Sequence, residues 1–141
     1  MSRRDIAHLL GCEPRSITFT SGGTEADNLA LRAAVKDLGC KRIVTSKAEH
    51  IAVIASSEKM SQLFDIEVVY VKHHSDGTVD CDDLRNILAS GPKTIVSLMH
   101  ANNEVGVIQP LDEIAKACRE TNAYFHSDTV QTMAHYPFQL D

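Results

Sequence analysis

The sequence between residues 94 and 127 reads TIVSLMHANNEVGVIQPLDEIAKACRETNAYFHS. It begins with a nearly continuous apolar run at residues 95–99, which is typical of a strand covered on both faces of a parallel sheet. A helix is indicated over residues 110–120, because apolar residues recur at the i, i+3, i+4 and i+7 positions of one face: Leu111, Ile114, Ala115 and Cys118. A second short strand follows at residues 124–127. The segment therefore predicts a strand–helix–strand unit.

The same alternation continues outward along the chain. Further strands are expected at residues 17–20, 42–45 and 66–71, with the buried strand running over 94–101. Further helices are expected at residues 24–38, 50–63 and 81–89, and Pro110 is expected at the first position of the last helix. This pattern predicts an α/β fold with a mostly parallel sheet and flanking helices.

Composition indicates one compact globular domain of 141 residues, of which 43% are hydrophobic and 23% are charged. The net charge of -5 argues against binding to nucleic acid or to an anionic membrane. No apolar run approaches the roughly 18 residues that span a bilayer, and the N-terminus has no apolar core of a signal peptide. The four cysteines are scattered without a CxxC pair, so we expect reduced thiols and a cytoplasmic location.

Four polar clusters each follow a predicted strand. They comprise residues 21–24, 49–50, 102–104 and 128–131. In open parallel sheets, ligands bind beyond the carboxyl ends of the strands, so these clusters are expected to converge on one crevice.

The first cluster is a glycine-rich turn that leads into a helix. Gly22 and Gly23 would let the backbone approach a phosphate, which the amides of the helix N-terminus favour. The alternative is a tight turn in which Ser21 or Thr24 caps the helix. The turn lacks the pattern of a Walker A loop or of a dinucleotide fingerprint.

Each of the other clusters also has two interpretations. Asp128 could cap a helix, or it could pair with a protonatable ring nitrogen while Gln131 contacts a neighbouring oxygen. His50 could cap a helix or cover a flat ring, and Asn103 could belong to a turn or contact a ligand carboxylate. A metal site is not expected, because the histidines and cysteine at residues 73–81 have no recognisable ligand spacing.

Four segments together resemble a known family. They are residues 18–28 (TFTSGGTEADN), residues 49–53 with Glu49-His50, residues 100–110 (HANNEVGVIQP) and residues 125–131 (FHSDTVQ). In order and spacing they are similar to motifs of the NifS-like and IscS-like cysteine desulfurases. That family belongs to the class V aminotransferase-like group and has the type I pyridoxal-phosphate fold.

The resemblance implies six ligands for pyridoxal 5'-phosphate: Gly23, Thr24, His50, Asn103, Asp128 and Gln131. Gly23 and Thr24 would bind the phosphate. His50 would stack on the pyridine ring and act as the catalytic group that moves protons.

The resemblance also implies the contacts of the rest of the cofactor. Asn103 would contact the cofactor or the substrate carboxylate. Asp128 would keep the ring nitrogen protonated, and Gln131 would bind the ring oxygen.

The implied activity converts L-cysteine to L-alanine and leaves a persulfide that supplies sulfur for iron–sulfur clusters or thiolation. A sulfur-acceptor protein and a homodimer are implied for the full-length enzyme. A selenocysteine lyase, a class V aminotransferase and a non-catalytic binding module with the same fold remain as alternatives.

Residues 1–141 would form a single, partial cofactor-binding domain of such an enzyme. The family's N-terminal strand, its Schiff-base lysine segment and its C-terminal small domain would lie outside this range. None of the lysines follows Asp128, so we expect this chain alone to have little or no activity. The persulfide-forming cysteine also belongs to a later segment, so the four cysteines here are not expected to take its role.

Overall fold

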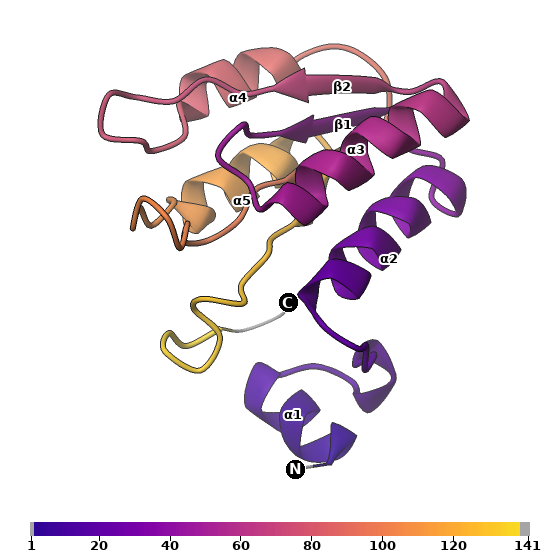
Figure 1. The fold of residues 1–141 in the computed structure, drawn as a ribbon, viewed down its shortest axis with the longest axis vertical. Coiled ribbons are helices and arrows are strands. Elements are labelled where there is room, and N and C mark those ends of the chain that lie inside the picture. Colours follow the sequence, from indigo (N-terminus) through magenta and orange to yellow (C-terminus); the bar gives the residue numbers. More distant parts are fainter. Residues whose placement is uncertain (1, 139–141) are drawn as a thin grey trace.

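The structure is a computed structural model that describes residues 2–138. A parallel sheet has the strand order β2-β1-β3-β4, and helices cover it (Figure 1). The strands are β1 (Arg42–Thr45), β2 (Glu67–Tyr70), β3 (Thr94–Ser97) and β4 (Tyr124–His126). The helices are α1 (Arg3–Leu10), α2 (Gly23–Lys36), α3 (Ile51–Phe64), α4 (Cys81–Leu88) and α5 (Leu111–Glu120), with a 3-10 turn η1 (Pro14–Ser16). The predicted α/β fold is confirmed.

Two hydrophobic cores lie on opposite faces of the sheet. Ile43 and Ile95 pack with residues of α2 and α3, two helices that lie side by side (Figure 1). Val44 and Val96 point the other way and pack with residues of α4 and α5. Because side chains alternate along a strand, a strand buried on both faces must be apolar at successive positions. The apolar run at residues 95–99 has this cause.

The predicted strand at residues 17–20 is wrong. Ile17 has extended dihedral angles, with φ of -91° and ψ of 121°, but no strand in the described part of the chain pairs with this segment. Its β-branched composition therefore gives an extended connection between η1 and α2 rather than a strand. The following glycine cluster consequently follows a connection and not a strand.

The buried strand is shorter than residues 94–101. β3 ends at Ser97, and Ala101 makes only an isolated antiparallel bridge to Ile108. Asn102 causes the turn between these two bridge partners, since its side-chain oxygen accepts hydrogen bonds from the amides of Glu104 (2.7 Å) and Val105 (2.9 Å). Pro110, expected at the first helical position, is the N-cap of α5 instead.

Helix α1 was not predicted. A capping box starts it, in which Ser2 and Asp5 exchange hydrogen bonds, and Gly11 ends it with a left-handed φ of 68°. Figure 1 shows α1 away from the sheet, next to the C-terminal segment. Within residues 2–138, none of the helices has the length and apolar character needed to cross a membrane.

The sheet has a topological switch between β1 and β3. The chain moves from β1 outward to β2, then crosses to β3 and continues to β4 on the other side. Ligands in open α/β sheets bind outside the carboxyl ends of the strands at such a point. The segments that follow β1, β3 and β4 therefore meet at this edge, together with the N-terminus of α2.

Candidate active site

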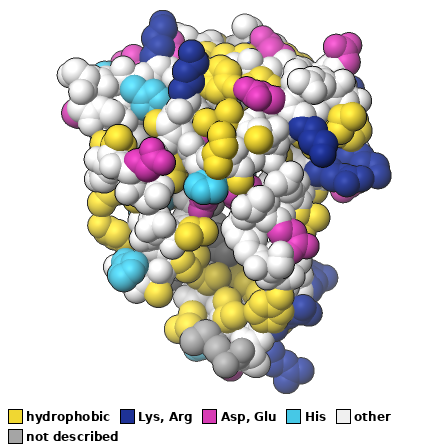
Figure 2. Space-filling model, in the orientation of Figure 1, with side chains coloured by type: hydrophobic (Ala, Val, Ile, Leu, Met, Phe, Trp, Pro, Cys, Tyr) yellow, Lys and Arg dark blue, Asp and Glu magenta, His cyan; other side chains and the backbone are white. Residues whose placement is uncertain are grey.

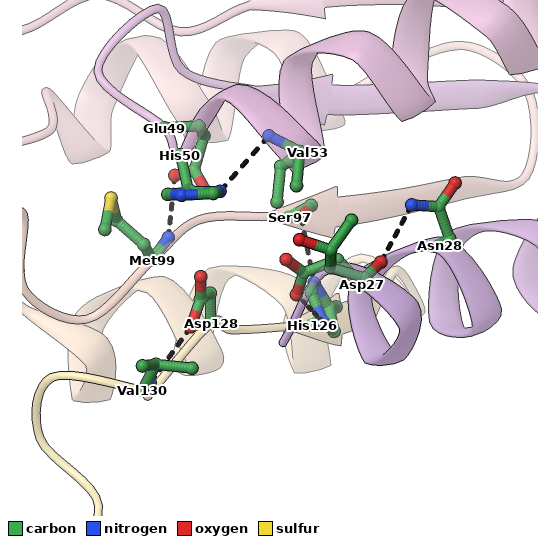
Figure 3. A network of polar contacts seen from close by, with 12 residues as sticks. Asp27, Asn28, Glu49, His50, Val53, Ser97, Met99, His126, Asp128 and Val130 are labelled. Atoms are coloured by element: carbon green, nitrogen blue, oxygen red, sulfur yellow. Dashed lines mark hydrogen bonds and ion pairs between the residues drawn. The ribbon is translucent and has the colours of Figure 1, made fainter. Parts of the chain in front are cut away.

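A cavity of about 220 Å³ lies at the carboxyl ends of β1, β3 and β4. Its lining residues are Gly23, Thr24, Asp27, His50, Met99, Asn103, Asp128, Val130 and Gln131. All six residues that the sequence nominated as ligands are among them. They come from the start of α2, the start of α3 and the loops after β3 and β4, so the structure brings four distant segments to one cavity. Figure 3 shows several of these side chains from close by.

The N-terminus of α2 meets the cavity without a side-chain cap. Gly22 occupies the N-cap position, so neither Ser21 nor Thr24 caps the helix. Ser21 is engaged elsewhere, because both its amide (2.6 Å) and its hydroxyl (2.7 Å) bind the carboxylate of Glu25. The first intrahelical bond runs from the amide of Ala26 to the oxygen of Gly22. Within residues 2–138, no side chain caps the amides at the start of α2, so these amides are free to bind an anion.

Gly23 lies close to the loop that follows β4. A Cβ atom added at Gly23 would lie 3.1 Å from Cγ2 of Val130, which is tighter than ordinary contact. The absence of a side chain therefore allows the helix start and the Asp128 loop to approach each other. The cavity is therefore narrow between the N-terminus of α2, which can bind an anion, and the loop that carries the carboxylate of Asp128.

His50 caps α3 and also lines the cavity, so its role as a cap does not exclude contact with a ligand. Its Nδ1 atom accepts a hydrogen bond of 3.2 Å from the amide of Ala52, which starts α3. An accepting Nδ1 carries no hydrogen, so the neutral imidazole has its proton on Nε2. The ring is exposed at the cavity, which leaves Nε2 able to donate to a ligand.

The two asparagines have separate places. Asn102 is structural, since its side-chain amide donates to the oxygen of Ala48 at 2.6 Å and so ties the loop after β3 to the turn before α3. Asn103 is exposed and lines the cavity. Asn102 therefore fixes the position of its neighbour Asn103 relative to His50.

Asp128 presents a carboxylate to the cavity at the end of β4. One carboxylate oxygen accepts a 2.9 Å hydrogen bond from the amide of Val130, which fixes the side chain (Figure 3). The backbone oxygen of Asp128 accepts from the amide of His100 at 3.0 Å, so the parallel ladder of β3 and β4 extends to this residue. Gln131 is exposed on the same cavity wall.

Two buried acids beside the cavity were not predicted as site residues. Asp27 lines the cavity although only 3% of its surface is exposed, and burial followed by the charge of Asp128 raises its pKa to about 6. Glu49 lies behind His50 with 8% exposure, and burial raises its pKa to about 8. A helical position three residues after Thr24 faces the same side, which was the available signal for Asp27.

The arrangement combines a helix start with free amides, an imidazole and a carboxylate around one small space. Such a set can hold an anionic group at one end and a cationic or protonated group at the other. A metal-binding group of three or more histidine, cysteine or acidic side chains is absent from residues 2–138.

Comparisons with known proteins show the family of the chain and proteins with a similar fold. Residues 1–141 match the family Aminotransferase class-V. A cysteine desulfurase IscS from Dictyoglomus turgidum is 40% identical over 142 residues, covering 99% of this chain and 36% of the relative. A solved NifS-like protein has a TM-score of 0.89 at 34% identity, with 98% of this chain and 38% of that chain covered.

A second solved structure, "SspA in complex with cysteine", has a TM-score of 0.86 at 29% identity and covers 97% of this chain and 40% of that chain. The chain thus spans about a third of the length of the curated relatives that it matches.

Proposed function

We propose that this chain, which belongs to the class-V aminotransferase family, is the cofactor-binding part of a pyridoxal-phosphate-dependent cysteine desulfurase. The observation that carries the proposal is the single cavity lined by all six nominated ligands. The names of the curated relatives and the structural likeness to a NifS-like protein support it.

The residues present fit pyridoxal 5'-phosphate. The uncapped start of α2 suits the phosphate, because free backbone amides and the helix dipole favour an anion. Asp128 suits a protonated pyridine nitrogen, since a carboxylate and a nearby ring cation each favour the charged form of the other. When bound, the cofactor supplies an electron sink for negative charge that develops on the substrate.

Each of the six residues predicted as ligands has a role in the proposal. Gly23 and Thr24 bind the phosphate, and Asp128 holds the proton on the ring nitrogen. Gln131 binds the ring oxygen. His50 covers the ring and moves a proton through Nε2, which is the atom that its cap hydrogen bond leaves free.

Asn103 completes the proposed set of contacts. Its exposed amide lies on the cavity wall, where it contacts the cofactor or the substrate carboxylate. Asn102 supports this role from outside the cavity, through its bond to Ala48.

The proposed substrate is L-cysteine, and the products are L-alanine and a persulfide sulfur. The relative solved with cysteine supports this substrate class. Three of the four cysteines of this chain are buried, which suits a structural role and leaves the persulfide to another part of the enzyme. We place that part, the lysine that binds the cofactor covalently and the small domain outside residues 1–141, and we expect this chain alone to bind the cofactor without turnover.

The setting of the enzyme is also part of the proposal. A sulfur-acceptor protein, a homodimer and supply of sulfur to iron–sulfur clusters follow from the desulfurase assignment. The unpaired cysteines in the described residues suit a reducing compartment such as the cytoplasm.

Binding of pyridoxal 5'-phosphate to the 141-residue chain tests the cavity. We expect Asp128→Asn to weaken binding by about tenfold to a hundredfold, because a hydrogen bond to a charged group is worth roughly 1.5–3 kcal/mol. Asp112→Asn on α5 is the matched control and should bind as the unchanged chain does. Isothermal titration of each variant with pyridoxal 5'-phosphate measures its affinity, and titration with pyridoxal measures the contribution of the phosphate. Equal affinity of the Asp128→Asn variant would contradict the assigned ligand.

The non-catalytic alternative makes a different prediction. A scaffold that has lost the chemistry need not distinguish the phosphorylated compound from pyridoxal. We expect pyridoxal 5'-phosphate to bind more tightly than pyridoxal, and Gly23→Val to remove this preference, since the added side chain enters the narrow space next to Val130. Equal binding of the two compounds would favour the scaffold.

A further inference from the structure

Asp27 is an acid at an apolar position of α2. The buried face of this helix consists of Asp27, Leu31, Ala34 and Val35, which follow the spacing of one helical stripe. The last three of these belong to the core between α2, α3 and the sheet. A carboxyl group in such a stripe costs free energy unless a partner compensates for its lost hydration.

The contacts of Asp27 give only partial compensation. Its Oδ2 atom is buried and has no hydrogen-bond partner within residues 2–138. Its Oδ1 atom lies 3.6 Å from Nε2 of His126, which is too long for a good hydrogen bond. Because Asp27 lines the cavity and its charge is not fully compensated, that charge can act on whatever the cavity binds.

His126 is held in place from the other side. Its Nδ1 atom lies 2.9 Å from Oγ of Ser97, the residue opposite it in the β3–β4 register (Figure 3). Burial lowers the pKa of His126, so its ring is neutral, and its Nδ1 atom shares one hydrogen bond with the hydroxyl of Ser97. Nε2 is the ring atom that faces Asp27, and a neutral ring next to the carboxyl group does not cancel its charge.

Asp27 and Asp128 act on the same space. His126 and Asp128 are two residues apart on an extended segment, since the ladder bonds from Leu98 to His126 and from His100 to Asp128 continue past β4. They therefore lie on the face of the sheet that α2 covers. Both acids line the cavity, and the negative charge of Asp128 contributes to the raised pKa of Asp27.

Four other titratable side chains surround Asp27, and they come from the elements packed against α2. His126 comes from β4, Asp128 from the loop after it, and Glu49 and His50 from the start of α3. Burial keeps Glu49 protonated at neutral pH, and His50 is exposed. Above its pKa of about 6, Asp27 therefore adds a negative charge next to Asp128.

We propose that Asp27, packed beside the His126 ring, is a second carboxylate behind Asp128, and that its negative charge helps to hold the proton on the ring nitrogen of the bound cofactor. Asp27 is a positioning residue, because it acts through the electric field and not by replacing Asp128 as the partner of the ring. The inference rests on the proposed binding of pyridoxal 5'-phosphate.

The first test uses the chain without ligand. Carboxyl ¹³C NMR should show Asp27 titrating at about 6, because of burial and of the charge of Asp128. In the Asp128→Asn variant this midpoint should fall. A midpoint at the ordinary value of 3.8, or one that Asp128→Asn leaves unchanged, overturns the inference.

The second test uses pyridoxal 5'-phosphate labelled with ¹⁵N in the ring. Above pH 6, Asp27→Asn should lower the pH at which the bound ring nitrogen loses its proton by about one unit, which is typical of removing a nearby opposite charge. Asp37→Asn, at the exposed C-cap of the same helix, is the matched control and should leave this pH unchanged. An unchanged ring-nitrogen titration in Asp27→Asn overturns the inference.

The two tests separate the inference from the function on which it rests. If the unchanged chain binds no pyridoxal 5'-phosphate, the proposed function fails and the role of Asp27 toward the ring fails with it. The ligand-free titration then still shows whether the two acids sense each other. If the ligand binds and only the ring-nitrogen effect is missing, the function stands and the role of Asp27 does not.

Discussion

At the scale of single residues, Glu49 shows how a charge can be removed from a buried site. Its Oε1 atom accepts a 2.7 Å hydrogen bond from the amide of Met99, which joins the turn before α3 to the end of β3 (Figure 3). Its Oε2 atom is buried without a partner in the described residues. Burial, opposed by this hydrogen bond, raises the pKa from 4.5 to about 8, so the group is neutral at pH 7.

This protonation predicts a loss of stability as the pH rises. Below pH 4.5 the carboxyl group of Glu49 is protonated in both the folded and the unfolded chain, and the free energy of unfolding suffers no loss from its ionisation. Between pH 4.5 and about 8 only the unfolded chain releases the proton, so the free energy of unfolding falls, by at most about 1.4 kcal/mol per pH unit. Glu49→Gln keeps the accepting oxygen and cannot ionise, so its stability relative to the unchanged chain should grow across this window.

Urea denaturation at a series of pH values measures the difference between the two chains. Glu58→Gln, at an exposed position of α3, is the matched control, because its carboxylate faces water in both states. A difference between Glu49→Gln and the unchanged chain that stays constant from pH 4.5 to 8 would show that Glu49 ionises normally in the folded protein.

At the scale of secondary structure, α2 connects the core to the cavity. Leu31 is fully buried between this helix, α3 and the sheet, whereas Leu29 on the same helix is 48% exposed. We expect Leu31→Ala to lower the free energy of unfolding by about 2–5 kcal/mol, because it removes buried methyl groups and leaves a cavity. Leu29→Ala should cost much less. Urea denaturation of the two variants checks this, and similar losses would mean that α2 does not pack as described.

The elements differ in how far the sequence could predict them. The apolar run of β3 and the periodic helix α5 were predictable, because burial on two faces and on one face give distinct patterns. Helix α1 has one buried residue, Ala7, so its signals were the cap residues Ser2 and Gly11 rather than periodicity. Residues 17–20 have the composition of a strand, but a strand also needs a partner, which composition cannot supply.

At the scale of the whole molecule, the convergence of distant segments was predictable from topology. Parallel strands place their carboxyl ends together, so His50, Asn103 and Asp128 could be expected at one edge. The buried acids Asp27 and Glu49 were harder to foresee. Their burial depends on how α2 and the turn before α3 pack over the sheet, and a local sequence pattern does not record that packing.

The two cores share one sheet, and each core contains a buried cysteine whose reactivity can show whether that core is intact. Cys40 belongs to the core of α2 and α3, Cys118 belongs to the core of α4 and α5, and Cys12 lies partly exposed outside both. Burial raises the pKa of Cys40 and raises that of Cys118 to about 12, so neither thiol should react in the folded chain. We expect a disulfide reagent to label one thiol rapidly without denaturant, and Cys12→Ser to remove this reaction.

In increasing urea, the three core thiols, Cys40, Cys81 and Cys118, should become reactive together. Each core needs the strands β1 and β3 as one of its walls, through Ile43 and Ile95 on one face and Val44 and Val96 on the other. Loss of either core therefore removes support from the other, and a chain of this size is expected to unfold in one step. Pulse labelling of the Cys12→Ser variant, with mass spectrometry of its peptides, locates each thiol that reacts. If Cys40 reacts at clearly lower urea than Cys118, the layer of α2 and α3 opens independently, and the cavity opens with it.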